Sequence, residues 1–393
     1  MKSINRQIAL SSVIRFLIYF FHWMVLAHLP VLLKHYGFTD VRIGVTIGLL
    51  ALSSMSLMLP MGAFSDFFSP KRTILAGAVL FGVYFAALRS VRSFTYMIPV
   101  VVIGGLGIAA LIVVSESLYL KQFGREKRGV RVAIYQLCTY LGFGLGPLTG
   151  ALLLQYGTVR MFDAAVLGAF LIFCLGLFLK DYGAVSFSFR KYGEDIFQFK
   201  PLLLIACIFV IGTHFGVEQS SFSLLMRENL GFSPKTIGLI FSGIGLWMAA
   251  IVLFIGRLHD KRESVFIFLL CGMAVSGLFQ FLTTWAFDFR SLLIIRMMHT
   301  MGDAVALLEL SVLIAMFFPC DRLGGNSGLL YSIRTMATFI AAVMCGWINR
   351  NWDYSASFFT SGIFMAIFVT ASVLYVRISS KRMQDVGWKG SDG

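Results

Sequence analysis

Two pairs of residues in this chain combine a histidine with a carboxylate at helical spacing. His214 and Glu218 are four residues apart, and so are His299 and Asp303. Side chains at positions i and i+4 lie on the same face of a helix, so each imidazole would lie beside a carboxylate. Histidine titrates near neutral pH, and a neighbouring carboxylate increases its affinity for a proton. The pattern therefore predicts two sites that take up and release a proton.

These four residues stand inside long apolar runs, where an ionisable side chain is expensive. Such a side chain at mid-membrane costs roughly 2.5–3.5 kcal/mol on insertion scales, so it normally faces a cavity or a partner. The same reasoning adds His22, His28 and Arg296, although any single histidine can instead be a hydrogen-bonded packing residue. Arg296 could bind an anionic solute or pair with Asp303, two turns further on. Arg334 is one or two turns from the end of its run, where its side chain can snorkel.

The composition places these residues in a membrane. The 393 residues are 58% hydrophobic and 13% charged, with a mean hydropathy of +0.83, whereas a soluble domain is about a quarter charged. The apolar runs match the ~20 residues that a helix needs to cross the hydrocarbon. We therefore expect an all-α integral membrane protein with twelve transmembrane helices, at about 8–33, 43–64, 73–90, 94–120, 132–155, 162–180, 201–225, 236–256, 264–285, 290–317, 329–349 and 354–377.

The net charge of +14 is unevenly distributed between the two sides of this topology. With the N-terminus inside, 22 of the 33 Lys and Arg residues fall on the inner side, as the positive-inside rule requires. Both termini are therefore predicted to be cytoplasmic, and the protein is expected in the cytoplasmic (inner) membrane. Anionic membrane lipids are sufficient partners for this charge, so no nucleic acid is expected. The six cysteines form no C-x-x-C pair, and no metal or cofactor is expected.

The chain contains two copies of one unit. Several residues return after an offset of 194 or 193 positions, at matching places in the order of spans; the pairs are Gly37 and Gly231, Gly62 and Gly256, Asp66 and Asp260, and Glu116 and Glu309. We expect six-helix bundles at 1–180 and 201–377, a cytoplasmic central loop at 181–200 and a cytoplasmic tail at 378–393. A parallel duplication leaves a cavity between its halves, which can rock around a site at the midplane.

A short polar gap follows the second span and again the eighth. The gaps read G-A-F-S-D-F-F-S-P-K-R from Gly62 to Arg72 and G-R-L-H-D-K-R from Gly256 to Arg262. With two six-span halves, they resemble the major facilitator superfamily over essentially the whole chain. The resemblance implies a transporter fold in which this loop holds the inward gate shut, through Gly62, Asp66, Lys71, Arg72, Gly256, Asp260, Lys261 and Arg262. The alternative is a solvated cytoplasmic turn.

The resemblance has two further features that bear on the gate. The first copy departs from the family pattern, because Phe67 and Ser69 replace a basic residue and a second glycine. Glu116 and Glu309 lie near inner helix ends beside the basic loops, and we interpret both as salt-bridge partners of the gate.

The fifth span carries a glycine-rich signature. Gly142, Gly146, Pro147 and Gly150 form G-x-x-x-G-P-x-x-G, which resembles a family motif associated with exchangers and drug efflux. Small residues four apart also let helices approach closely, so the motif can have a packing role with no bearing on direction. The resemblance to drug exporters is incomplete, because Val101 stands where efflux members carry an arginine and the first span has no central acidic residue.

These observations predict a secondary transporter that moves a small organic solute by alternating access. Proton coupling through the histidine–carboxylate pairs is expected, and the signature of the fifth span favours export by antiport. The chain has no H-E-x-x-H, G-x-S-x-G or G-x-x-x-x-G-K motif, so we expect neither an enzyme nor ATP drive. We expect a monomer. The alternatives are an uptake symporter or uniporter for an anionic metabolite, and a transporter-like receptor that binds solute without moving it.

Overall fold

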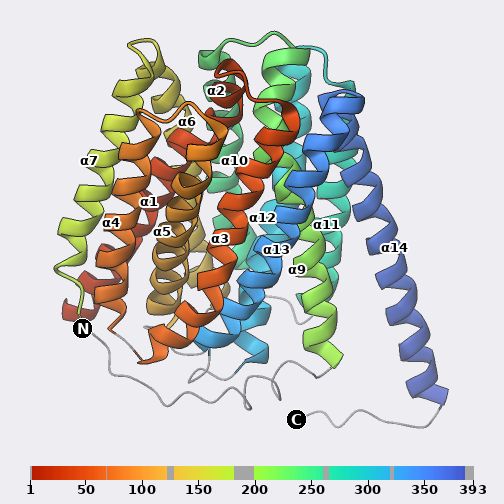
Figure 1. Cartoon of the computed structure of the whole chain (residues 1–393). Coiled ribbons are helices and arrows are strands. Elements are labelled where there is room, and N and C mark those ends of the chain that lie inside the picture. The colour runs from red at the N-terminus through yellow and green to blue at the C-terminus, as the bar shows by residue number, and fades with distance from the viewer. Residues whose placement is uncertain are drawn as a thin grey trace.

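The computed structural model describes residues 2–67, 69–121, 128–180, 199–259, 265–318 and 323–385. Within these ranges the regular structure is helical throughout (Figure 1). The helices are α1 (Lys2–Leu26), α2 (Leu29–His35), α3 (Asp40–Phe67), α4 (Pro70–Leu88), α5 (Phe94–Lys121), α6 (Arg128–Leu154), α7 (Thr158–Gly176), α9 (Phe199–Val217), α10 (Pro234–His259), α11 (Val265–Leu282), α12 (Phe289–Phe317), α13 (Leu323–Asn351) and α14 (Tyr354–Asp385). Three short turns, η1 (Glu218–Phe222), η2 (Leu225–Asn229) and η3 (Thr283–Trp285), complete the regular elements.

The predicted spans are present as helices. Eleven helical segments in the described residues are long and apolar enough to cross a membrane. The remaining predicted span coincides with α3, which is 28 residues long and runs beside the others through the bundle (Figure 1). Only helices satisfy every backbone hydrogen bond within one chain segment, as hydrocarbon requires. The all-α expectation is therefore confirmed.

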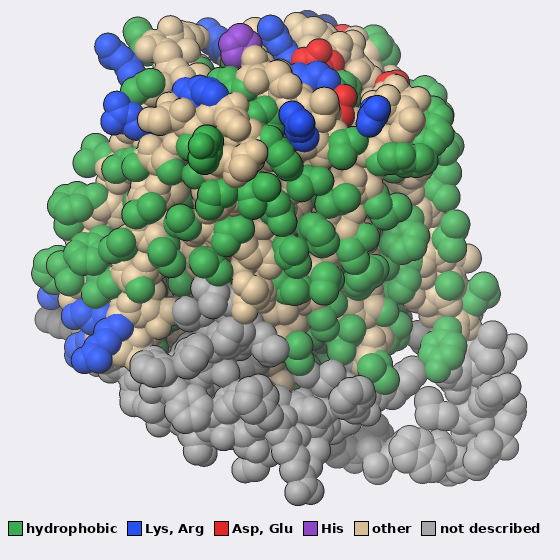
Figure 2. Space-filling model, in the orientation of Figure 1, with side chains coloured by type: hydrophobic (Ala, Val, Ile, Leu, Met, Phe, Trp, Pro, Cys, Tyr) green, Lys and Arg blue, Asp and Glu red, His purple; other side chains and the backbone are tan. Residues whose placement is uncertain are grey.

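The surface has the polarity of a protein embedded in lipid. Figure 2 shows apolar side chains around the waist of the visible face, basic and acidic side chains at its upper end, and further basic side chains at the lower left. Large apolar residues are exposed on this surface, including Leu167, Phe254 and Ile294 at 62–67% exposure. So much exposed apolar area would aggregate in water, whereas lipid tails solvate it.

Two of the predicted spans are interrupted. The first breaks between α1 and α2 at Ala27 and His28, and Pro30 occupies the first turn of α2. The seventh continues from α9 into π-helical turns that begin at Glu218. A π turn adds a residue to the helical repeat and changes the direction of the side chains that follow, and such turns are frequent at functional sites.

Helix α12 carries three of the candidate site residues, and its start is well defined. Asp288 accepts a 2.7 Å hydrogen bond from the Ser291 backbone nitrogen, and Ser291 Oγ accepts one from the Asp288 backbone nitrogen. This capping box satisfies donors that the first turn leaves free. The hydrogen bonds from Ser291 hold the pKa of Asp288 below its usual range.

The glycine signature lies where α6 packs against α1. A Cβ on Gly142 would lie 2.6 Å from the carbonyl oxygen of Phe16, and one on Gly146 would overlap that of Phe20. Gly150 is equally close to the backbone of Met24. The motif therefore allows a backbone-to-backbone contact between two helices. A role in the direction of transport stays a prediction.

Two other helix pairs join the N-terminal helices (α1–α7) to the C-terminal helices (α9–α14). Helix α3 packs along α13, and α6 packs along α10. Both contacts are close at glycines: a Cβ on Gly44 would lie 2.9 Å from Gly346 Cα, and Gly144 faces Gly245. These contacts hold the two sets of helices around a central space.

The α1–α6 contact gives a test of the packing role. Gly146→Ala places a methyl group against the Phe20 carbonyl, and overpacking of this kind costs about 1–3 kcal/mol. We expect a lower thermal unfolding midpoint in detergent. Gly82→Ala is the matched control, because its Cβ would lie 3.5 Å from Ala169 Cβ, an ordinary contact. Equal midpoints for the two variants would contradict the packing role.

Candidate functional site

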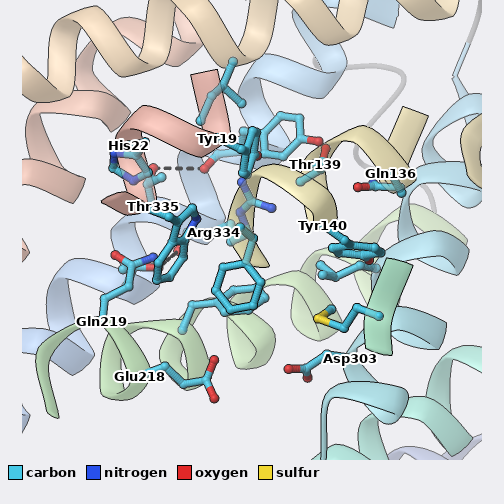
Figure 3. Close-up of a pocket in the computed structure, with 18 of the residues that line it drawn as sticks. Tyr19, His22, Gln136, Thr139, Tyr140, Glu218, Gln219, Asp303, Arg334 and Thr335 are labelled. Carbon is cyan, nitrogen blue, oxygen red and sulfur yellow. Dashed lines mark hydrogen bonds between the residues drawn. The ribbon is translucent and has the colours of Figure 1, made fainter. Parts of the chain in front are cut away.

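A cavity of about 210 Å³ lies between the N-terminal and the C-terminal helices. Its lining comes from α1, α3, α5 and α6 on one side and from α9, η1, α10, α12 and α13 on the other. Most of the lining is aliphatic or aromatic, with a few polar and charged side chains. Figure 3 shows Glu218 and Asp303 on one wall, with His22 and Tyr19 elsewhere in the lining.

Five of the six candidate site residues come together next to this wall: Glu218, Arg296 and Asp303 line the cavity, and the buried His214 and His299 contact them. We name them the histidine–carboxylate cluster: His214 from α9, Glu218 from η1, and Arg296, His299 and Asp303 from α12. His299 Nε2 lies 2.9 Å from Glu218 Oε1 and 3.1 Å from Asp303 Oδ2. His214 Nε2 lies 3.2 Å from His299 Nε2. The two pairs predicted by spacing therefore form one network, because α9 and α12 bring them together.

The hydrogen bonds of His299 leave a position in this network where one further proton fits. Its Nδ1 lies 3.0 Å from the backbone oxygen of Ser276, which only accepts hydrogen bonds, so Nδ1 carries a hydrogen. A bare Nε2 would then face the oxygens of Glu218 and Asp303, which are acceptors when ionised. A proton on Nε2 turns both contacts into charge-assisted hydrogen bonds. The geometry is that of an imidazolium between two carboxylates.

His214 provides a second position for a proton in the cluster. Its Nε2 lies 3.8 Å from Asp303 Oδ1 and 3.4 Å from Ser276 Oγ, and Ser276 Oγ donates a 2.7 Å hydrogen bond to the same carboxylate oxygen. The His214 and His299 rings are stacked, with centroids 4.8 Å apart. A proton can therefore pass between the two imidazoles by a small movement.

Arg296 is held within the cluster. Its guanidinium forms an ion pair with Glu218 and donates a 2.8 Å hydrogen bond to Gln280 Oε1. It also lies over the Phe222 ring, 4.6 Å from the centroid. Of the two roles that the sequence left open for Arg296, pairing with Asp303 does not match these contacts, because Asp303 accepts from Ser276 on α11 while Arg296 pairs with Glu218 on η1.

The cluster also has the spacing of a metal site. Donor atoms of His214, Glu218, His299 and Asp303 all lie within 4.8 Å of one another. Two imidazoles and two carboxylates suit Zn²⁺. The guanidinium of Arg296 nevertheless neutralises one of the carboxylates and would repel a dication. Glu218, Asp303 and Arg296 sum to a charge of −1, so a single proton on His299 makes the cluster neutral.

The two histidines of the first span lie outside the cluster. His22 is on α1 and lines the cavity beside Trp23 and Phe81 (Figure 3). His28 Nε2 lies 2.8 Å from the Pro147 backbone oxygen, between α1 and α6. His28 is therefore a packing residue with a satisfied hydrogen bond, and a role for His22 stays a prediction.

A buried ion pair in the N-terminal helices was not expected. Arg15 NH2 lies 3.3 Å from Glu116 Oε2, and Arg15 Nε donates a 3.0 Å hydrogen bond to Thr139 Oγ1. The guanidinium lies 4.5 Å from the centroids of the Tyr19 and Tyr135 rings. Glu116 is thus paired inside the bundle. The rule that flags charges inside apolar runs could have identified Arg15 as well.

The structure describes the contacts of only some of the remaining gate residues. Glu309 accepts a 3.0 Å hydrogen bond from His259 Nδ1. Lys71 Nζ donates to the Leu177 backbone oxygen, and the Arg72 backbone nitrogen donates to Ser69 Oγ at the start of α4. Of the other gate positions, Gly256 is buried. Gly62 and Asp66 lie within α3, but the surroundings of their side chains are not described. Asp260, Lys261 and Arg262 lie outside the described ranges. A gating role for this motif stays a prediction.

Arg334 does not snorkel to the helix end. It lies on α13 in the cavity lining, half-buried, with its guanidinium 4.4 Å from the centroid of the Tyr331 ring. The sequence indicated its depth along the helix but not the cavity beside it, which only the packing of α13 against α3 and α9 creates.

The buried pair in the N-terminal helices can be tested by a double-mutant cycle. Glu116→Leu leaves the Arg15 charge buried without its partner, which costs about 3–5 kcal/mol. Replacing both residues, as Arg15→Met with Glu116→Leu, removes both charges and is expected to restore most of the stability. The measurement is the unfolding free energy in detergent. A double variant as unstable as the single one would contradict a pairing role.

Comparisons with known proteins agree with this architecture. The family model of the Major Facilitator Superfamily matches residues 11–217 and 204–390. An uncharacterized MFS-type transporter of Methanocaldococcus jannaschii is 22% identical over 87% of this chain and 90% of its own. The quinolone resistance protein NorA of Staphylococcus aureus is 22% identical over 87% and 89%.

Solved structures share the fold. The human organic anion transporter MFSD10 superposes with a TM-score of 0.73, at 19% identity, over 93% of this chain and 99% of that one. The nucleoside transporter NupG gives a TM-score of 0.76, at 11% identity, over 93% and 98%. The family model covers both repeats of the chain and almost all of its length. This protein therefore belongs to the major facilitator superfamily of membrane transporters.

Proposed function

We propose that the protein is a proton-coupled secondary transporter that moves a small organic solute across the cytoplasmic membrane. The observation that carries this proposal is the histidine–carboxylate cluster, which one proton makes neutral, on the wall of a cavity between the two sets of helices. Membership of the superfamily supports alternating access around that cavity. Residues 1–180 and 201–377 are the two bodies that we expect to move, and one copy of the chain suffices.

The cluster offers a physical route from a proton to a movement. Protonated His299 attracts both Glu218 and Asp303, and so holds η1, α11 and α12 together. When the proton leaves, an imidazole lone pair faces two ionised carboxylates, and the cluster carries a charge of −1. That charge is costly in a site with little water, so its contacts must rearrange or a new proton must enter. Either event changes the relative energies of the two transporter states.

Export by antiport is the direction we favour. The glycine signature in α6 resembles that of exchangers, and the relative NorA is named for resistance to quinolones. The start of α1 and the end of α14 lie at the same end of the bundle (Figure 1), which supports the proposal that both termini are cytoplasmic. Because Val101 stands where efflux members carry an arginine and the first span has no central acidic residue, the proton site proposed here is taken from this chain's own cluster and not from a family template.

Proton coupling is testable with a pH dye enclosed in proteoliposomes. Pools of lipophilic cations and of organic anions are added in turn, and the expected result is a solute-dependent pH change that Asp303→Asn abolishes. Asp163→Asn is the matched control, because Asp163 forms an exposed pair with Arg89, 3.1 Å apart and 48% exposed on both sides. Chelation by EDTA should leave the signal unchanged.

Three results would count against this assignment. An unchanged signal in Asp303→Asn would remove the cluster from the coupling step. Loss of the signal on chelation would point to a metal ion at the cluster. The absence of a pH signal from folded wild-type protein with every solute pool would favour a uniporter or a receptor.

Exchange of labelled for unlabelled solute requires no net proton flow, so it separates proton coupling from solute binding. In Asp303→Asn we expect counterflow of labelled solute from a preloaded vesicle to persist, because the cavity is intact. Uphill accumulation driven by a pH gradient should be lost, because the proton site has changed. Loss of both activities together would mean that Asp303 contacts the solute or supports the fold.

A further inference from the structure

Three arginines of the described residues line the cavity, and they differ in their partners. Arg15 is paired with Glu116, and Arg296 is paired with Glu218. Arg334 forms no ion pair and no side-chain hydrogen bond with the residues that the structure describes; its contact is with the face of the Tyr331 ring. Among the described lining residues, Arg334 is therefore the arginine without an ionic partner.

The carboxylates of the cavity cannot supply the missing partner. Of the described lining residues, Glu218 and Asp303 are the acidic ones, and both belong to the histidine–carboxylate cluster. With a proton on His299 that cluster is neutral, and the Arg15–Glu116 pair is neutral as well. The described part of the lining is then left with one uncompensated positive charge, on Arg334. A half-buried cation in an apolar setting is costly alone and binds an anion strongly.

The shape and lining of the cavity restrict what that anion can be. Aromatic side chains face the space from both sets of helices, among them Tyr19, Trp23, Phe143 and Phe241. Trp23 and Phe143 pack edge to face, 4.7 Å between centroids, so their ring positions are defined. An apolar cavity of about 150 Å³ holds a benzene molecule. The 210 Å³ here therefore suits a molecule with one or two rings.

We propose that Arg334 binds the carboxylate of an aromatic monocarboxylate whose ring occupies the aromatic part of this cavity. The planar guanidinium presents two parallel donors that match a carboxylate, and Tyr331 stacked on its face orients it. One guanidinium without an ionic partner can neutralise one anionic group of the ligand. A second anionic group would have to displace Glu116 or Glu218. The binding site itself does not depend on the proposed function. Only the identification of this molecule as the transported solute rests on that proposal.

The test is equilibrium binding to the full-length protein in detergent, with no proton gradient. The probe is 1-naphthoate, and 1-naphthamide is its uncharged counterpart of nearly the same shape. Binding is followed by quenching of tryptophan fluorescence, because Trp23 lines the cavity, and by the thermal unfolding midpoint. We expect naphthoate to bind more tightly than naphthamide to the wild-type protein.

Substitutions on α13 then show whether the charge of Arg334 is responsible for the binding of naphthoate. Arg334→Gln should raise the Kd for naphthoate about 10- to 100-fold, as expected for the loss of hydrogen bonds between charged groups. Arg334→Lys keeps the charge without the planar fork, should give an intermediate Kd, and serves as the test if Arg334→Gln does not fold. Arg350→Gln, at the exposed end of the same helix, should bind as the wild type does.

Several outcomes would overturn the proposal. They are equal binding of naphthoate and naphthamide, wild-type affinity in Arg334→Gln, absence of naphthoate binding to folded wild-type protein, and binding of tetraphenylphosphonium in place of naphthoate. Equilibrium binding to the wild-type protein in detergent separates this inference from proton coupling, because it requires no movement of protons. Failure of coupling with binding intact would leave the Arg334 site standing.

Discussion

Charge inside a membrane must be compensated, and that constraint shapes the interior of this protein. Beside the cavity, the described residues do this with two groups of charged side chains, and each group lies within one set of helices. Arg15 and Glu116 neutralise each other between α1 and α5. The histidine–carboxylate cluster joins α9, η1 and α12, and we propose that one proton neutralises it. The first arrangement contains its own counter-charge, whereas the second would need an ion that can leave.

The helix geometry makes the second arrangement possible. An ideal helix would continue past Val217, but the chain enters π-helical turns at Glu218. This turn directs the Glu218 carboxylate at both Arg296 and His299 on α12. The partners on α12 hold this carboxylate in place, and the hydrogen bond from Ser276 holds Asp303 beside His299.

Close contacts between helices at glycines are the second feature that determines the arrangement of the helices. They let α6 lie directly on α1, and they bring α3 to α13 and α6 to α10. Small residues at such contacts allow close approach without fixing it by interlocking side chains. The N-terminal and C-terminal helices thus meet along smooth surfaces, with the polar cluster placed inside one of the two sets. This division suits a molecule in which one body changes its charge while the other moves relative to it.

The sequence by itself determined the helices. Runs of about 20 apolar residues have one stable form in lipid, because backbone groups there must bond within the segment. It also identified five of the cluster residues, since charge inside such runs and the spacing of four are local properties. It indicated the pairs at a spacing of four but not the partners on other helices. The pairing of Arg296 with Glu218, the meeting of His214 and His299, and the burial of Arg15 depend on how helices distant in sequence rotate and pack. For the same reason only the tertiary structure placed Arg334 in the cavity, because a helical pattern gives the depth of a residue but not the space that neighbouring helices leave beside it.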